Sequence, residues 1–230
     1  MTRIAALLAH DIRLQYRYGI YAAYAFVIAL YAALLISAGP ALPAWVAPLL
    51  IFVDPAGVGF IFLGALMLLE RSEGVRSALA ASPVGATDYL AAKLVTLTAM
   101  ALVASAVLMA IGHNTPDAPL VLVTVALTSA MYVGLGVLCA RRFATVNGYL
   151  IGAGALLTPL IAPGFLAFLD PLPGPLLLLP AVAQLRLMLV GLDARTASAP
   201  ELALMLAVSA AAGALAVWLA HRDLRREFGK

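Results

Sequence analysis

The sequence predicts an all-α integral membrane protein with six transmembrane helices, and three observations support this fold class. The 230-residue chain is 64% hydrophobic and only 11% charged, whereas soluble domains are about half apolar and a quarter charged. Its apolar residues form six stretches of about 20, the length that crosses a bilayer core as a helix. With six spans, all but two of the 14 Lys and Arg residues fall on one side of the membrane, as the positive-inside rule requires. We expect one transmembrane domain over 1–230.

The N-terminal segment 1–19 is expected to form an amphipathic helix at the membrane surface. At 100° per residue, its four basic side chains fall within a sector of roughly 80°, and the apolar ones spread over the opposite side. The basic residues are Arg3, His10, Arg13 and Arg17. The alternative is a basic tail beside the first span.

Six predicted spans follow, and each ends at a polar or proline-containing stretch. They cover about 20–38, 48–69, 91–112, 120–140, 146–169 and 201–220. Pro159 and Pro163 lie inside the fifth, so we expect that helix to be kinked or broken there.

The apolar segment 171–200 is harder to place, because Pro180 and Arg186 interrupt it. We expect short re-entrant or interfacial helices here. Such interrupted segments can lie within the membrane only where they pack against protein. Counting the segment as a seventh span would put the two termini on opposite sides. The distribution of basic residues favours six spans with both termini cytoplasmic.

The longest polar stretch, 71–90, is the first cytoplasmic loop and has a helical pattern of its own. Pro83 would end this helix, and a short amphipathic helix between two spans can insert into a groove of a partner. The alternative is a solvated loop that happens to be helical. One face carries Glu73, Arg76, Ser77 and Ala80, and another carries Val75 and Leu79.

The stretch "FLGALMLLERSEGVRSALAASPVGATDYLAAKL" resembles the corresponding region of type-2 ABC exporter permeases. More narrowly, "VDPAGVGFIFLGALMLLERSEGVRSALAASP" is similar to small bacterial drug-export permeases described as fluoroquinolone exporters. The chain departs from the superfamily pattern at "GVRS", where many members have Gly-Thr-Leu-Glu. The matching positions are Glu70, Glu73, Gly74, Leu79, Ser82, Pro83, Tyr89, Leu90 and Lys93.

This resemblance implies a permease in the bacterial cytoplasmic membrane that moves a hydrophobic or drug-like compound outward and has no catalysis of its own. It further implies that two copies pair and that each docks on a separate P-loop ATPase subunit through residues 73–82. ATP and magnesium would then belong to the ATPase. The residues that would couple the two subunits are Glu70, Glu73, Gly74, Val75, Arg76, Leu79 and Pro83. Export of another cargo, such as heme or a lipid, is the alternative within the superfamily.

Three residues are candidates for a substrate pathway. Asp54 is the sole acid well inside a predicted span, and a buried carboxylate in a membrane is a functional candidate by default. It could contact a cationic substrate, titrate, or cap a segment that begins at Pro55; a water-facing turn near the outer interface is the alternative. Tyr24 and Tyr31 are seven positions apart on one helical face and could stack on a flat substrate at a dimer cavity. Anchoring and core packing are the alternative for both.

Glu70 ends the second predicted span, where it could pair with Arg71, Arg76 or the N-terminal helix and act as a structural lock. Arg141 and Arg142 are expected to be topology determinants.

Other chemistry has little support in the sequence. The lone Cys139 excludes an internal disulfide, and three scattered histidines offer no zinc-type cluster. Neither a phosphate loop nor a nucleophile elbow is present, so we expect no enzyme, no metal site and no bound cofactor. The positive charge lies in membrane-flanking loops and does not suggest nucleic acid. An ion-coupled transporter that uses Asp54 and a membrane scaffold are the remaining alternatives.

Overall fold

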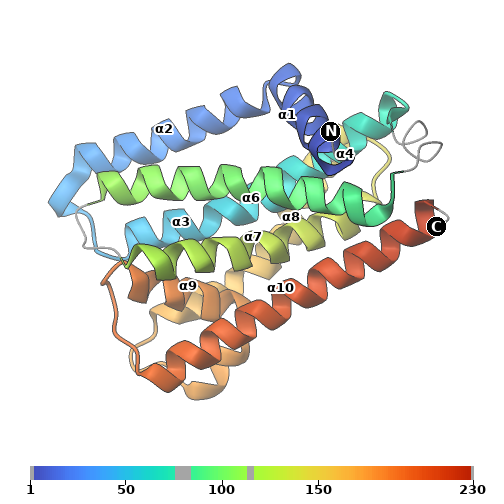
Figure 1. Cartoon of the computed structure of the whole chain (residues 1–230). Coiled ribbons are helices and arrows are strands. Elements are labelled where there is room, and N and C mark those ends of the chain that lie inside the picture. Colours follow the sequence, from blue (N-terminus) through green and yellow to red (C-terminus); the bar gives the residue numbers. More distant parts are fainter. Residues whose placement is uncertain (1–2, 76–83, 113–116, 229–230) are drawn as a thin grey trace.

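The structure is a computed structural model that describes residues 3–75, 84–112 and 117–228 (Figure 1). Over these residues the chain is helical, and six helices are long and apolar enough to cross a membrane. The predicted all-α fold with six spans is therefore confirmed. The spans are Ile20–Ala38, Val46–Ser72, Ala86–Ile111, Ala118–Ala140, Val146–Phe168 and Ala199–Arg226.

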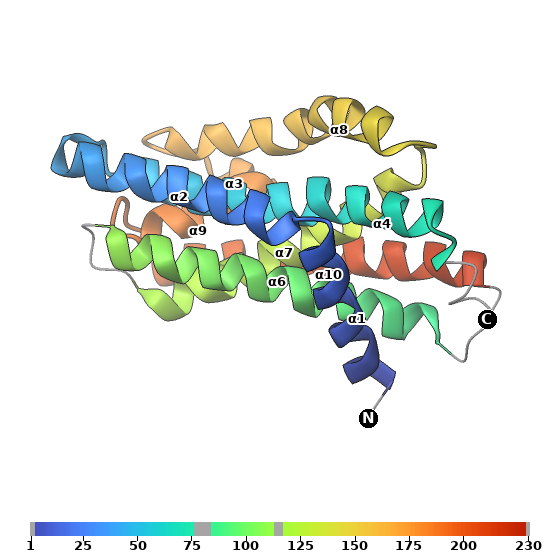
Figure 2. The same cartoon turned by 90° about the horizontal axis from the view of Figure 1, so that it is seen from above.

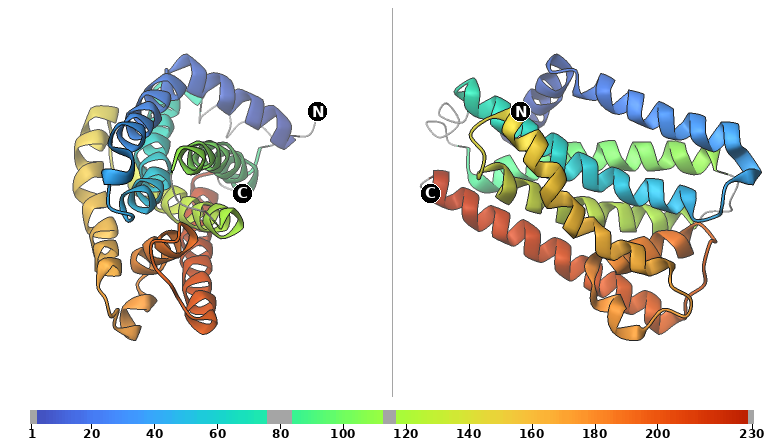
Figure 3. Two further views of the ribbon diagram at one scale, coloured as in Figure 1. Left: turned by 90° about the vertical axis from the view of Figure 1, so that its left-hand side faces the viewer. Right: turned by 180° about the vertical axis from the view of Figure 1, so that it is seen from behind.

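The fourth span, α7 (Ala118–Ala140), occupies the centre of the bundle together with the second span. In each of the two, 61% of the most apolar stretch is buried, against 17–22% for the first, fifth and sixth spans. α7 packs against α6 (Ala86–Ile111) and α10 (Ala199–Phe228), and the end-on view in Figure 3 places it between them. A Cβ atom at Gly134 would lie 2.5 Å from the backbone of Ala216. The small residue therefore allows the backbones of α7 and α10 to touch.

The second span consists of three segments: α3 (Val46–Ala56), a π-helical turn η2 (Gly57–Phe62) and α4 (Leu63–Ser72). Pro55 lies inside the last turn of α3 and has no N–H to donate, and the π-helical turn begins two residues later. The Tyr149 hydroxyl donates a hydrogen bond to the carbonyl of Phe60 within η2. A side chain from another helix thus satisfies a backbone group in the widened turn.

The predicted N-terminal helix is present as α1 (Arg3–Arg17), which joins α2 (Ile20–Ala38) at Gly19. Gly19 has a φ of 68°, a left-handed conformation that glycine adopts without steric cost. Figure 2 shows α1 crossing the end of α6 at an angle to the spans. Leu7 and Leu14 of α1 are buried against the bundle, and Arg13 is exposed.

The fifth span breaks near its prolines, as expected. It begins as α8 (Val146–Ile161) and continues as a tight 3₁₀ segment, η3 (Ala162–Phe168). Two short helices follow in the interrupted segment, η4 (Gly174–Leu178) and α9 (Pro180–Gly191). Most of α9 is buried, and it packs on α3, α7 and α10, so this segment lies against protein as its sequence requires. A further 3₁₀ turn, η1 (Gly39–Ala41), follows α2.

Two spans extend beyond their predicted limits. α6 begins at Ala86 rather than near residue 91, because the Asp88 carboxylate accepts a hydrogen bond of 3.2 Å from the N–H of Gly85 and caps the helix start. α10 continues to Phe228 rather than ending near residue 220. Arg225 and Arg226 lie in its last turn, where basic side chains interact favourably with the negative end of the helix dipole.

Candidate functional site

A buried cluster of charged side chains joins three elements at one end of the bundle. Lys93, on the first turns of α6, is completely buried. Its ammonium group forms an ion pair of 2.7 Å with Asp11 of α1 and a second ion pair with Glu70 of α4. The Tyr89 hydroxyl donates a hydrogen bond of 2.6 Å to the other oxygen of Glu70. We call Asp11, Glu70, Tyr89 and Lys93 the charged cluster.

Two carboxylates share one ammonium group in this cluster. Asp11 Oδ2 has no hydrogen-bond partner among the described residues. Burial raises the pKa of Asp11, and the ion pair with Lys93 opposes that rise. Taking charges out of water is costly, so such a group remains stable only while every partner stays in place. The cluster therefore ties α1 firmly to the second and third spans.

The charged cluster connects both ends of the predicted coupling loop. α4 ends at Ser72 and α6 begins at Ala86, so Glu70 lies on the helix before the connection, and Tyr89 and Lys93 lie on the helix after it. A second contact between α1 and α6 lies close by, where the Gln15 amide donates to Thr96 Oγ1 at 3.3 Å. Any force on the loop therefore acts on two spans and on α1 together.

The structure places the predicted coupling residues as follows. Glu70 is 1% exposed and pairs with Lys93, whereas Arg71 is exposed. Of the three alternative partners predicted for Glu70, Arg71 is therefore wrong, and Arg76 lies outside the described residues. The link to the N-terminal helix exists, but Lys93 mediates it. Glu73 is exposed and lies 3.7 Å from Arg17, a distance and an exposure at which an ion pair contributes little.

The remaining coupling residues lie at the edge of the described chain. Gly74 has a φ of 72°, which favours glycine, and nothing lies within 4 Å of the position of its missing Cβ. Val75 is half-buried. Arg76, Leu79 and Pro83 lie outside the described residues, as does most of the predicted coupling helix.

A second site lies within the membrane, where the Tyr24 hydroxyl donates a hydrogen bond of 2.7 Å to Asp54 Oδ2. Both side chains are buried. Asp54 and Pro55 lie inside α3, which begins at Val46. The two alternatives of a helix cap and a water-facing turn at Asp54 are therefore wrong.

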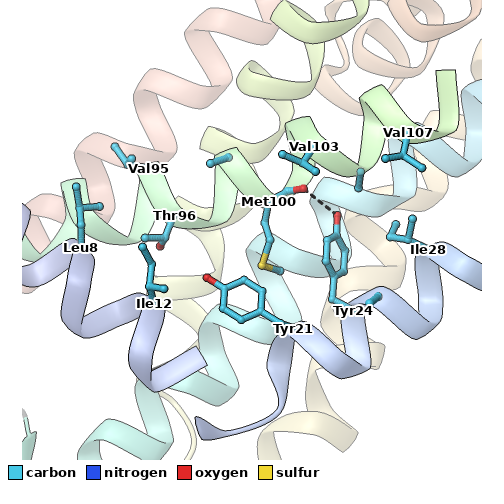
Figure 4. Close-up of a pocket in the computed structure, with 13 residues that line it drawn as sticks. Leu8, Ile12, Tyr21, Tyr24, Ile28, Val95, Thr96, Met100, Val103 and Val107 are labelled. Carbon is cyan, nitrogen blue, oxygen red and sulfur yellow. Dashed lines mark hydrogen bonds between the residues drawn. The ribbon is translucent and has the colours of Figure 1, made fainter. Parts of the chain in front are cut away.

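Tyr24 also lines a groove between α1, α2 and α6, with a volume of about 630 Å³. Figure 4 shows Tyr21 and Tyr24 on one wall and Met100 on the other, with a 3.4 Å hydrogen bond from Tyr24 to the Met100 carbonyl. The lining is almost wholly apolar, and Val95 and Val103 at its edge are exposed. In a membrane-spanning segment this face meets lipid or another subunit. Asp54 is not part of the lining but hydrogen-bonds the Tyr24 hydroxyl.

Tyr31 lies in a different cavity from Tyr24. It lines a space of about 530 Å³ with Leu34 of its own helix and Leu50 of α3. The shared helical face predicted one aromatic surface for both tyrosines. In the structure the two rings line different cavities.

Sequence reasoning missed Asp11 as a site residue and did not assign Lys93 its role. The available signal was the same one that identified Asp54: a charged side chain next to or inside an apolar span is costly and therefore needs a partner. The described residues contain no group of three or more His, Cys, Asp or Glu side chains that could hold a metal ion.

The chain was compared with known proteins. Residues 2–228 match the model of the fluoroquinolones export permease protein family. Two curated proteins of Mycobacterium tuberculosis, from strains CDC 1551 and H37Rv and both named fluoroquinolones export permease protein, are 29% identical over 192 residues. The alignment covers 79% of this chain and 81% of each relative. No solved structure matches the chain. With the family match over nearly its whole length and six apolar helices, this multi-pass membrane protein belongs to the fluoroquinolones export permease protein family.

Proposed function

We propose that this chain is the membrane-spanning subunit of an ATP-driven exporter and that a separate P-loop ATPase subunit supplies ATP and magnesium. The observation that carries this proposal is the charged cluster. Lys93 binds Glu70 and Asp11 where the predicted coupling loop joins the second and third spans. A loop held in this way is suited to transmit the movement of a partner into the membrane.

In the proposed cycle this chain changes conformation and catalyses no reaction itself. Closure of the ATPases moves the loop with Glu73, Gly74 and Val75, and the charged cluster transmits the movement to α1, α4 and α6. Two copies of the permease form the transport path between them. The basic end of the bundle, which carries both termini (Figure 1), faces the cytoplasm of a bacterial cell under the positive-inside rule.

We further propose that the cargo is hydrophobic or drug-like and that Tyr24 and Asp54 contribute to its path. The groove beside Tyr24 has the volume and the apolar lining of a small-molecule site. The names of the Mycobacterium relatives favour a drug-like cargo over heme or lipid. Tyr31 would act from its separate cavity.

Affinity purification of the tagged protein from its native membrane tests the ATPase partner. We expect a P-loop ATPase to co-purify with the wild type and to be lost from the double variant Val75→Asp/Leu79→Asp. The matched control is Ala144→Asp, which adds a carboxylate to an exposed position in the loop after α7, at the same end of the bundle. It should retain the ATPase.

The negative outcomes distinguish the alternatives. If no ATPase co-purifies with the wild type in a mild detergent that preserves membrane complexes, the proposal of an ATP-driven exporter is overturned. Transport by the protein alone in vesicles with an imposed proton gradient would then assign it to ion-coupled transporters. If Ala144→Asp loses the ATPase as readily as the double variant, residues 73–82 are not the specific contact.

A further inference from the structure

The cytoplasm-proximal half of α10 carries one stripe of side chains that changes from apolar to basic toward the helix end. Leu215, Leu219, Arg222 and Arg226 are spaced by four, three and four positions, so they share one face. A cavity of about 300 Å³ lies on this face, where Leu138 of α7 completes its lining. The basic end of the stripe thus borders a hollow.

A second cavity borders the first at Leu219. It has a volume of about 310 Å³ and lies between α7, α8, η3 and α10. Leu135, Leu215 and the kink prolines Pro159 and Pro163 are part of its apolar lining. We call the two neighbouring cavities together the α10 groove; the first has Arg222 and Arg226 in its lining, and the second is apolar.

Contacts on the other side of α10 fix the direction of this stripe. His221 lies 2.9 Å from Thr87 Oγ1 of α6, and Leu224 is completely buried. Arg222 and Arg226 are exposed. The helix end is therefore held in place with its two arginines facing away from α6.

Among the described side chains, positive charge exceeds negative charge at the end of the α10 groove. The carboxylate of Asp223 borders the first cavity, but it pairs with Arg141, which also donates to the Asp223 carbonyl at 3.1 Å. Among the described side chains, no carboxylate forms an ion pair with Arg222 or Arg226. The Arg222 guanidinium lies over the ring of Trp218 at 5.6 Å. Two cations therefore border the opening, and Trp218, which lines neither cavity, lies beside Arg222.

We propose that the α10 groove binds an anionic phospholipid of the surrounding membrane. The phosphate would lie between Arg222 and Arg226, since guanidinium groups bind phosphate oxygens in a bidentate manner. The acyl chains would pass Leu219 into the apolar cavity, and Trp218 would lie at the level of the headgroups. Basic pockets between transmembrane helices at this surface attract anionic headgroups. A zwitterionic lipid fits less well, because its own cation offsets the charge of its phosphate.

This inference does not depend on the proposed transport function, and its test involves no transport. The chain has only two tryptophans, Trp45 and Trp218. Trp45→Phe, or Trp45→Tyr if the first variant folds poorly, leaves Trp218 as the only indole. The purified variant is reconstituted in phosphatidylcholine vesicles that contain a fixed minor fraction of either brominated phosphatidylglycerol or brominated phosphatidylcholine. Bromine on the acyl chain quenches the fluorescence of Trp218 when it is in contact.

We expect phosphatidylglycerol to quench more strongly, with a preference of about fivefold in the relative binding constant for each arginine. Arg222→Gln/Arg226→Gln should bring this preference close to one, whereas Arg222→Lys/Arg226→Lys should retain most of it. The matched control Arg13→Gln/Arg17→Gln removes two exposed charges from α1 and should leave the preference unchanged. Gel filtration checks that each variant is folded.

Four outcomes overturn the proposal. Equal quenching by the two lipids, or a preference that survives in Arg222→Gln/Arg226→Gln, means that the arginines do not select an anionic lipid. Loss of the preference on addition of inorganic phosphate means that the opening binds free anions rather than a phospholipid. No quenching by either lipid means that protein, such as a second copy of the chain, covers the α10 groove.

Discussion

Lys93 Nζ lies 2.7 Å from Asp11 Oδ1, and this buried ion pair joins residues that are 82 positions apart in the chain. Since Lys93 also binds Glu70, its removal would leave two carboxylates buried without a cation. Such a loss costs about 3–5 kcal/mol. We expect Lys93→Met to lower the free energy of unfolding by an amount of this order, measured by denaturation in mixed micelles. Arg71→Met, which removes an exposed charge one residue from Glu70, should change it by less than about 1 kcal/mol. Equal losses would show that the cluster does not hold α1 to the spans.

The same cluster predicts a pH dependence of stability. The pKa of Asp11 is raised above its ordinary value of 3.8 by burial, against the opposing influence of Lys93. The folded protein therefore binds the proton of Asp11 more tightly than the unfolded chain, so the contribution of this group to stability is greatest at low pH and is lost as pH rises through the raised pKa. We expect the stability difference between wild type and Asp11→Asn to change across that window, in favour of the wild type at the acidic end. Thermal unfolding of both proteins across the acidic range measures it, and a constant difference would contradict it.

Asp54 and Tyr24 predict a selective transport defect. Asp54→Asn removes the only acid that Tyr24 contacts, and we expect it to weaken the export of cationic compounds more than that of neutral ones. Tyr24→Phe should do the same, because it leaves the Asp54 carboxylate without its hydrogen bond, at a cost of about 1–3 kcal/mol. Accumulation of a cationic and a neutral dye in cells, normalised to protein level, measures both. Tyr16→Phe alters an exposed tyrosine of α1 that has no proposed role in the path, and it serves as the matched control. Unchanged export by Asp54→Asn at normal protein level would exclude a role for this carboxylate.

The contact between Gly64 and Tyr149 predicts a large difference between two similar substitutions. A methyl group at Gly64 would overlap the Tyr149 ring, whereas nothing lies within 4 Å of the corresponding position at Gly57. Overpacking of this kind costs about 1–3 kcal/mol. We expect Gly64→Ala to be destabilised by this amount and Gly57→Ala to be close to neutral in thermal unfolding. Recovery of stability in Gly64→Ala/Tyr149→Leu would confirm the overlap as the cause; similar values for the two single variants would refute it.

Filling the groove beside Tyr24 tests whether a ligand enters it. Ala99 lines the groove and is exposed, so Ala99→Trp should occupy its space without disturbing the core. We expect export to fall at least about tenfold if the cargo uses this groove, since a bulky ring would exclude it from most of the volume. Ala110→Trp adds the same ring to an exposed position of α6 that does not line the groove. If both variants export normally, the cargo takes another path.

The sequence is enough to predict the spans, because each is a long apolar stretch and the basic residues cluster on one side. The break in the fifth span also follows from sequence, since Pro159 and Pro163 cannot continue an α-helix undisturbed. The hydrogen bond at Asp54 is partly predictable, because a lone acid in a span needs a partner. The spacing of the residues, however, does not identify Tyr24 as that partner.

Other features depend on which helices become neighbours, and no local pattern encodes that. Asp11 and Lys93 lie 82 positions apart, and their contact requires α1 to cross α6. Tyr24 and Tyr31 share a helical face, yet they line different cavities, which their spacing in the sequence does not reveal. The π-helical turn likewise depends on the close approach of α7 and α8 to the glycines of the second span.

That turn has a geometric consequence for the second span. Asp54 and Glu70 are 16 positions apart, which in an uninterrupted α-helix separates their directions by about 160° around the axis. A π-helical turn contains an additional residue, so α4 is rotated relative to the continuation of α3. Asp54 then accepts a hydrogen bond from Tyr24 of α2, whose hydroxyl also contacts Met100 of α6, and Glu70 pairs with Lys93 of α6. The wide turn thus acts as a phase shift that lets one helix present acidic groups to one side of the bundle at two different depths.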